Sequence, residues 1–143
     1  MRVVLDTSAV YAALTNEPDS LSYEAAIAVA DACLISALSV FEAQTVLFRR
    51  FGMEKAARLD DFLAGVEAVV RPFDDDMVPL AFAAYRKFGR GSGHAAQLNY
   101  ADCASYALAK ALDLPLLFKG DDFARTDVTP ALPLLLAGAG GAA

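Results

Sequence analysis

Cysteine is scarce in this chain. Cys33 and Cys103 are its two cysteines, and neither belongs to a Cys-x-x-Cys pair of the kind that binds zinc or carries redox chemistry. Proteins of oxidising compartments that rely on disulfides use more cysteine than this. We therefore expect a reduced, intracellular protein.

Positive charge and histidine are also in short supply. The chain has 12 Lys and Arg against 18 Asp and Glu, a net charge of −6, and one histidine, His94. A protein that coats nucleic acid with a basic surface needs the opposite balance, so that class is excluded. An enzyme that meets phosphate groups through metal ions and a few local cations stays compatible with this composition.

Long apolar runs are missing as well. The segment 128–143 is uncharged, but Pro130, Pro133 and a Gly/Ala tail interrupt it, and it is shorter than the roughly 20 apolar residues of a membrane-spanning helix. The first residues already form a strand-like pattern, with no signal-peptide pattern before it. We expect a cytoplasmic protein that makes no contact with a membrane.

What the chain does have is enough apolar sequence for one well-filled domain. Its 143 residues are 57% apolar, above the usual share of roughly 45–50%. We place a single domain at residues 1–135 and a disordered Gly/Ala tail at 136–143. The surplus of apolar residues also suggests that a partner covers part of the surface.

Strand-like and helical patterns alternate along the chain. We expect strands at 3–5, 33–36, 67–72 and 115–118, with a last short strand from Val128, and helices at 9–14, 21–32, 39–51, 53–65, 74–88 and 102–112. This alternation predicts βαβ units with right-handed crossovers, and so an α/β fold around a parallel sheet.

Acidic residues follow the expected strands or open the next helix. They are Asp6, Glu42, Asp102 and the pair Asp121 and Asp122. A parallel sheet gathers its strand ends along one edge, so we expect these side chains to meet. Two bare charges about 4 Å apart cost roughly 4 kcal/mol at an effective dielectric of 20. A divalent cation with a preference for oxygen ligands, Mg²⁺ or Mn²⁺, would remove that cost.

Each acid also has a purely local explanation. Asp6 and Asp102 could cap the helices that follow them. Ser39 and Glu42 form the Ser-x-x-Glu pattern of a capping box, and Asp121-Asp122 could be a polar turn. Capping alone does not require all of them to follow strands, and this coincidence favours a common site.

Three sequence blocks carry a resemblance to a known family. They are Val4-Leu-Asp-Thr-Ser-Ala9, Leu98-Asn-Tyr-Ala-Asp-Cys-Ala-Ser-Tyr-Ala-Leu-Ala109, and Leu117-Phe-Lys-Gly-Asp-Asp-Phe123 with Thr126-Asp-Val128 after it. With the helix that bears Glu42 between them, the chain resembles PIN-domain ribonucleases, and most closely the VapC toxins of toxin–antitoxin modules, over residues 2–130. The second and third blocks are the specific ones.

The resemblance implies a three-layer α/β/α domain with a small parallel sheet and a catalytic centre that holds one or two Mg²⁺ or Mn²⁺ ions. It implies Asp6 and Asp102 as principal metal ligands, completed by Glu42 and by Asp122 in preference to Asp121. It also implies that Thr7 or Ser8 orients a carboxylate or a water, unless these residues only cap a helix.

The activity implied by the resemblance is hydrolysis of RNA phosphodiester bonds. The implied partners are a second copy of the chain and a VapB-type antitoxin that lies across the active-site groove. Because the net charge of −6 disfavours indiscriminate RNA binding, we expect one structured RNA, such as a tRNA or an rRNA loop, to be selected.

Several cations and aromatic residues have two readings. Arg86, Lys87, Arg90 and His94 either contact the RNA backbone or form a solvated helix end and loop. Arg49, Arg50 and Arg58 either form an exposed helix face or meet an acidic antitoxin segment. Tyr100 and Tyr106 belong to the core or its rim, or else stack on bases.

Three alternatives remain open. A haloacid-dehalogenase-type phosphatase needs Asp-x-Asp at its first strand, where this chain has Ser8. A receiver-type signalling domain could use Lys119, but its early acid pair and its phosphoacceptor Asp are absent. A catalytically inert PIN-like module that binds RNA or protein would keep the fold without the reaction.

Overall fold

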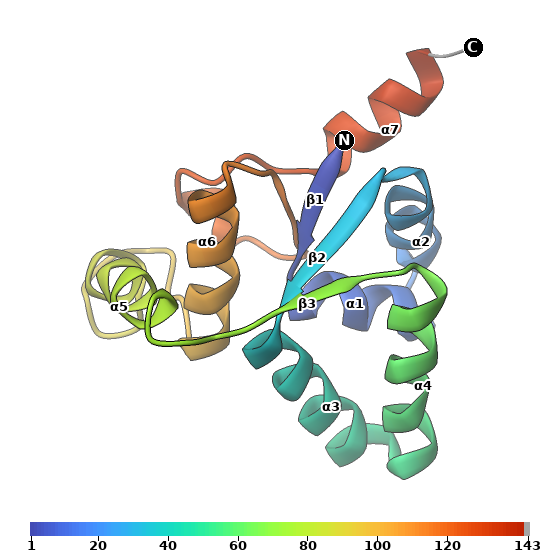
Figure 1. Cartoon of the computed structure of the whole chain (residues 1–143), viewed down its shortest axis with the longest axis horizontal. Coiled ribbons are helices and arrows are strands. Elements are labelled where there is room, and N and C mark those ends of the chain that lie inside the picture. The colour runs from blue at the N-terminus through green and yellow to red at the C-terminus, as the bar shows by residue number, and fades with distance from the viewer. Residues whose placement is uncertain (142–143) are drawn as a thin grey trace.

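The sheet of this protein is small and entirely parallel. A computed structural model describes residues 1–141 and contains strands β1 (Arg2–Leu5), β2 (Ala32–Ser36), β3 (Val69–Arg71) and β4 (Leu116–Leu117). Their spatial order is β3-β2-β1-β4, and every neighbouring pair is parallel (Figure 1). The predicted α/β fold with a parallel sheet is confirmed.

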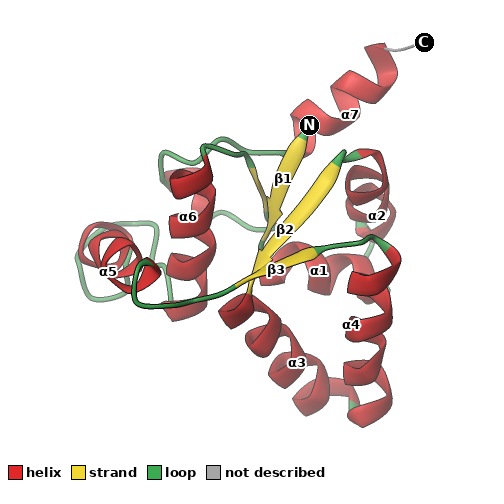
Figure 2. Ribbon diagram, in the orientation of Figure 1, coloured by secondary structure: helices red, strands yellow, loops and turns green. Residues whose placement is uncertain are grey.

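Helices cover both faces of the sheet. They are α1 (Thr7–Leu14), α2 (Ser20–Val29), α3 (Ala37–Phe51), α4 (Met53–Gly65), α5 (Met77–Phe88), α6 (Tyr100–Leu112) and α7 (Leu132–Gly141), with a 3₁₀ turn at Phe123–Arg125. Val3 and Leu5 point into a core shared with α1, α2, α3, α4 and α7, whereas Val4 points into a core shared with α5 and α6. Successive side chains of a strand point to opposite faces of the sheet, so each face is covered by its own layer of helices. This gives the three-layer arrangement in Figure 2.

The strand order reverses beside β1. The chain runs from β1 to β2 and β3 on one side, and then returns to place β4 on the other side. Parallel α/β sheets bind ligands at the carboxyl ends of the strands beside such a reversal. Asp6 stands there, because it directly follows β1 and its main-chain N–H donates to the carbonyl of Leu117 at 3.0 Å.

Several boundaries differ from the sequence-based expectation. Helix α5 begins at Met77, because the Asp74 carboxylate accepts from the N–H groups of Asp76 and Met77 and holds residues 74–76 as a turn. The expected strand from Val128 is wrong, since that segment contributes only an isolated bridge between Leu116 and Pro130.

The C-terminal segment was expected to be a disordered tail over residues 136–143. The structure continues α7 to Gly141, and residues 142–143 lie outside the described part of the chain. Both cysteines are buried and free. Within the described residues, no helix has the length and apolar character needed to cross a bilayer.

Candidate metal centre

Asp6 is the innermost acid of the site. Its side chain is 1% exposed and accepts three hydrogen bonds. The Ser8 hydroxyl and main-chain N–H donate to Oδ2 at 2.6 and 2.9 Å, and the Ser105 hydroxyl donates to Oδ1 at 2.7 Å. Asp6 is also the N-cap of α1, so it caps a helix and belongs to the acidic site at the same time.

Glu42 reaches the site from the second turn of α3. This helix begins after Ser36, whose hydroxyl accepts from the N–H of Leu38, so the proposed Ser39–Glu42 capping box is wrong. The Ser39 hydroxyl instead meets Ser105 at 2.9 Å. Because Glu42 is free of a capping role, its carboxylate accepts from the Asn99 side-chain amide at 3.4 Å.

Asp102 lies in the first turn of α6. The N-cap is Asn99 and not Asp102, because Asn99 Oδ1 accepts from the N–H of Asp102 at 2.9 Å. Asp102 Oδ2 accepts from the N–H of Asn99 at 3.0 Å, which completes a capping box. Asn99 therefore contacts two acids of the site and fixes them relative to each other.

One cavity of about 420 Å³ connects these acids. It is lined by Asp6, Thr7, Ser8, Tyr11, Glu17, Glu42, Val46, Arg50, Asp102 and Lys119. The Thr7 hydroxyl donates to the main-chain carbonyl of Ser39 at 3.0 Å, and Thr7 also lowers the pKa of Glu42 by a side-chain hydrogen bond. Ser8 makes the short hydrogen bonds to Asp6, so both expected orienting residues lie beside a carboxylate.

The acids of this cavity favour protons or a cation. Burial raises the pKa of the Asp102 carboxyl to about 7, and the negative charges of Asp6, Glu42 and Asp122 add to the effect. Burial also raises the pKa of Asp6, although hydrogen bonds from Ser8, Ser105 and the Thr7 main chain oppose the shift. The pKa of Glu42 is raised by burial and by the charge of Asp6. The carboxylates thus destabilise one another when all are ionised.

Of the last two acids, Asp122 is the one that acts on the site. It is half-buried and its charge raises the pKa of Asp102, whereas Asp121 is exposed. Neither lines the cavity. Across residues 1–141, no three Asp, Glu, His or Cys side chains are arranged to enclose a metal ion, so ligation by these acids remains a prediction.

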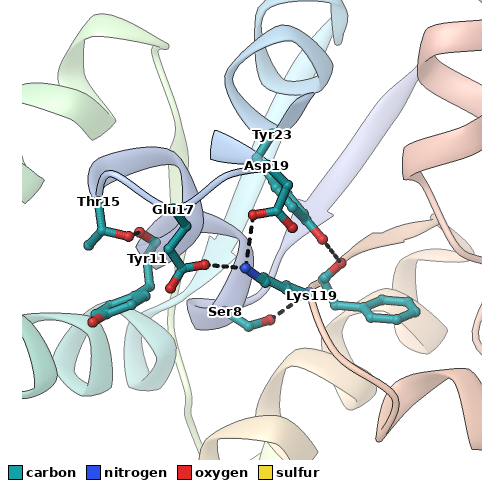
Figure 3. A network of polar contacts seen from close by, with 8 residues as sticks. Ser8, Tyr11, Thr15, Glu17, Asp19, Tyr23 and Lys119 are labelled. Carbon is teal, nitrogen blue, oxygen red and sulfur yellow. Dashed lines mark hydrogen bonds and ion pairs between the residues drawn. The ribbon is translucent and has the colours of Figure 1, made fainter. Parts of the chain in front are cut away.

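A salt-bridge cluster that the sequence analysis did not foresee closes one side of the cavity. The Lys119 ammonium pairs with Glu17 and Asp19, with 2.8 Å to the latter (Figure 3). The hydrogen bond to Asp19, and after it the one to Glu17, raises the pKa of the Lys119 ammonium, so this side chain stays charged. Lys119 also donates its main-chain N–H to the Ser8 hydroxyl at 3.0 Å. The α1–α2 connection is thereby tied to the end of β4.

The cations considered as RNA contacts lie away from the acidic cavity, and one of the cations considered as a helix face or an antitoxin contact lies on it. Arg50 lines the acidic cavity, but Arg86, Lys87, Arg90 and His94 do not. His94 packs edge-on against Phe88 and its Nδ1 accepts from the N–H of Ala96 at 3.0 Å, which is a structural role in its loop. Arg49 lines a second cavity between α3 and α4, and Arg58 pairs with Glu54 at 3.7 Å.

The two tyrosines also differ. Tyr106 is anchored, because its hydroxyl donates to Asp127 at 2.6 Å and its ring contacts Phe88. Tyr100 is 78% exposed and stacks on Tyr85, with 5.8 Å between ring centroids. Tyr100 therefore belongs to the surface and not to the core.

Fold and site together define a class: a three-layer α/β domain with buried carboxylates gathered where its parallel sheet reverses order. The family model for the PIN domain matches residues 3–128. The chain is 45% identical over 130 residues to ribonuclease VapC28 of Mycobacterium tuberculosis, covering 91% of this chain and 98% of that one.

Solved structures agree at the level of the fold. VapC20 of Mycobacterium tuberculosis, a toxin that cleaves the sarcin–ricin loop, has a TM-score of 0.76 at 15% identity, covering 89% of this chain and 96% of that one. VapBC2 from Rickettsia felis, bound to a DNA fragment from its promoter, has a TM-score of 0.65 at 18% identity, with coverage of 91% and 96%. The chain belongs to the PIN-domain family, among its VapC ribonucleases. The dehalogenase-type and receiver-type alternatives are therefore wrong.

Proposed function

We propose that this VapC ribonuclease is a metal-dependent endoribonuclease toxin that hydrolyses the phosphodiester backbone of a selected, structured RNA. The observation that carries the proposal is the meeting of three carboxylates from separate segments, Asp6, Glu42 and Asp102, in one cavity at the sheet reversal. Their pKa values are raised, first by burial and, for Glu42 and Asp102, also by neighbouring negative charges, and perturbed carboxyl groups of this kind gather at functional sites.

The donor set fits a hard divalent cation. All candidate ligands are carboxylate oxygens, the type that Mg²⁺ and Mn²⁺ bind in proteins. Asp6 and Asp102 would be the principal ligands, with Glu42 and Asp122 completing the set and Asp121 the weaker candidate. Such a cation supplies a hydroxide near neutral pH, by lowering the pKa of bound water, and offsets negative charge on the reacting phosphate.

The chain itself supplies orientation and local positive charge. The donors on Asp6 favour its ionised form, and Asn99 holds Glu42 and Asp102 in one relative position. Arg50 places a cation on the wall of the same cavity, where an RNA phosphate would arrive, whereas the Lys119 ammonium is paired with Glu17 and Asp19. Because the whole chain has a net charge of −6, which works against RNA binding, this local cation supports recognition of one RNA shape in preference to general binding.

The proposed partners are a VapB-type antitoxin and a second copy of this chain. Two exposed apolar surfaces support docking of proteins. One surrounds the cavity of about 590 Å³ between α3 and α4 and includes Phe48 and Met53. The other lies over α5 and the start of α6 and includes Phe82 and Tyr100. Apolar patches of this kind mark interaction surfaces.

The test is RNA cleavage by the protein and by Asp102→Asn. Asparagine keeps an oxygen that can accept from Asn99, so the cap survives while the charge is removed. We expect cleavage with Mn²⁺ by the wild type, none by Asp102→Asn, and normal cleavage by Asp113→Asn, which changes an exposed acid at the other end of α6. Cleavage at the normal rate by Asp102→Asn would refute the assignment.

Asp6→Asn should also abolish cleavage, but it is a less clean test. Both Asp6 oxygens already accept hydrogen bonds, so the NH₂ group of the introduced asparagine would face another donor. The substitution therefore breaks buried hydrogen bonds in addition to removing the charge. RNA binding by the wild type without cleavage in Mg²⁺ or Mn²⁺ would favour the catalytically inert alternative.

A further inference from the structure

A buried chain of hydroxyl groups leads from α3 through α6 to Asp6. The Ser39 and Ser105 side chains are both fully buried, at 0% exposure. Their hydroxyl oxygens lie 2.9 Å apart, and the Ser105 hydroxyl lies 2.7 Å from Asp6 Oδ1. The chain therefore joins three segments that are distant in sequence.

The direction of these hydrogen bonds follows from proton counting. An ionised carboxylate can only accept hydrogen bonds, so the single hydroxyl proton of Ser105 is donated to Asp6. The contact between the two serines then requires Ser39 to donate to Ser105. The same turn of α3 is held from the other side, because the Ser39 carbonyl accepts from Thr7, the residue next to Asp6. The Ser105 and Ser39 hydroxyls therefore each have a fixed donor role, and this turn of α3 is tied to the residue next to Asp6.

The second oxygen of Asp6 is fixed in the same manner. Ser8 Oγ accepts from the main-chain N–H of Lys119 at 3.0 Å, which directs its own proton to Asp6 Oδ2. Because donors hold both oxygens, the Asp6 carboxylate cannot rotate without breaking buried hydrogen bonds, and its remaining lone pairs keep a defined direction. Removing one donor would free that rotation.

We propose that Ser105, supported by Ser39, is a positioning residue that sets the orientation of the Asp6 carboxylate toward a bound divalent cation. The inference rests on the proposed metal centre. Hydrogen-bond partners of metal ligands commonly change metal affinity or activity by 10- to 100-fold when mutated. Ser105→Ala should therefore weaken Mn²⁺ binding by roughly 10- to 100-fold, and Ser39→Ala should cause a smaller loss, because Ser105 keeps its own bond to Asp6.

The experiment is calorimetric titration of EDTA-treated, dialysed protein with MnCl₂, together with a melting temperature for each variant. Thr15→Val is the matched control. It removes another buried hydroxyl, which donates to the Tyr11 carbonyl at 2.8 Å, without touching an acid of the site. We expect Thr15→Val to lower the melting temperature and to keep the wild-type Mn²⁺ affinity, and Ser105→Ala to lower both.

A Ser105→Ala protein with wild-type Mn²⁺ affinity and a reduced melting temperature would overturn the inference, because Ser105 would then serve packing alone. If Ser105→Ala does not fold, Ser39→Ala decides: weaker Mn²⁺ binding supports the inference and unchanged binding overturns it. Absence of Mn²⁺ binding by the wild type is a different result, since it refutes the proposed metal centre itself.

Discussion

At the scale of single residues, the acids of the cavity are placed for a task that costs stability. Asp102 shows this most clearly, because its carboxyl has a pKa of about 7 in the fold against 3.8 ordinarily. Each pKa unit corresponds to roughly 1.4 kcal/mol. At neutral pH without metal, the ionised group therefore favours unfolding. The proposed metal ligand Asp102 is thus a destabilising residue when no cation is bound.

Replacing Asp102 by Asn should make the metal-free protein more stable. The variant removes the buried charge and keeps an acceptor for the N–H of Asn99. We expect a higher melting temperature in EDTA, by roughly 2–4 °C for each kcal/mol gained in a chain of this size. Thermal unfolding followed by circular dichroism measures it. An unchanged or lower melting temperature would contradict the cost of this buried charge that the raised pKa of Asp102 implies.

The same shift predicts a pH dependence. Because the folded-state pKa of Asp102 is raised, the folded protein binds more protons than the unfolded chain between pH 4 and pH 7. The free energy of unfolding therefore falls as pH rises through this window. The pKa of Asp127 is lowered by the hydrogen bond from the Tyr106 hydroxyl, so Asp127 does not contribute to the fall in stability in this pH window.

We therefore expect metal-free protein to melt at a higher temperature at pH 5.5 than at pH 8, with a smaller difference for Asp102→Asn. Melting curves in EDTA at both pH values test this. Mn²⁺ should raise the melting temperature more at pH 8, where the ligands are ionised. If the metal-free wild-type protein is more stable at pH 8 than at pH 5.5, ionisation of these acids does not destabilise the fold.

At the scale of elements, helix starts build the site, since α1 and α6 both begin at it. Acidic side chains suit this position because the N-terminal end of a helix carries partial positive charge. Asn99 is the central residue here, since it caps α6, completes a box with Asp102 and donates to Glu42.

Asn99→Ala should weaken both fold and site. Loss of an N-cap costs about 1 kcal/mol, so the melting temperature should fall by a few degrees. The Glu42 and Asp102 side chains also lose their common partner, so Mn²⁺ affinity should fall too. Asn99→Asp separates the effects, because aspartate caps equally well but adds a negative charge beside Glu42. Equal Mn²⁺ affinity in all three proteins would exclude a role for Asn99 in the site.

The Lys119 cluster should govern the mobility of the α1–α2 connection. Lys119→Met removes both salt bridges to Glu17 and Asp19 and keeps the side-chain length. We expect faster amide hydrogen exchange in residues 15–20 and little change in β2 or α3. Lys110→Met, which removes an exposed pair with Asp127, is the control. Unchanged exchange in residues 15–20 would show that backbone contacts suffice there.

Sequence patterns predicted the element types as far as β4, the parallel sheet and the convergence of Asp6, Glu42 and Asp102 on one cavity, but missed α7. They succeeded because strand ends and helix starts are local signals. They failed where partners are set by tertiary position. Ser39 was considered for a capping box with Glu42 and instead meets Ser105, and Lys119 was not connected to Glu17 and Asp19. No spacing rule brings these residues together, and the order of the strands fixes which segments become neighbours.

At the scale of the whole molecule, an acidic protein carries a small acidic site, with Arg50 on its wall, and two exposed apolar surfaces. As a VapC ribonuclease, it should be toxic when produced alone. Expression of this chain should arrest growth, and co-expression of a small protein encoded beside it should relieve the arrest. Sequencing of RNA ends should show one dominant cut. Widespread cleavage would contradict selection of one structured RNA.

The pairing of the first strand with the last affects when the site can form during synthesis of the chain. β1 is synthesised at the beginning, but one of its two neighbours, β4, emerges more than a hundred residues later. Until Leu117 leaves the ribosome, the main-chain N–H of Asp6 lacks its acceptor, and α6 with Asp102 has only just been made. The site that joins Asp6 to Asp102 therefore assembles only late in the synthesis of the chain.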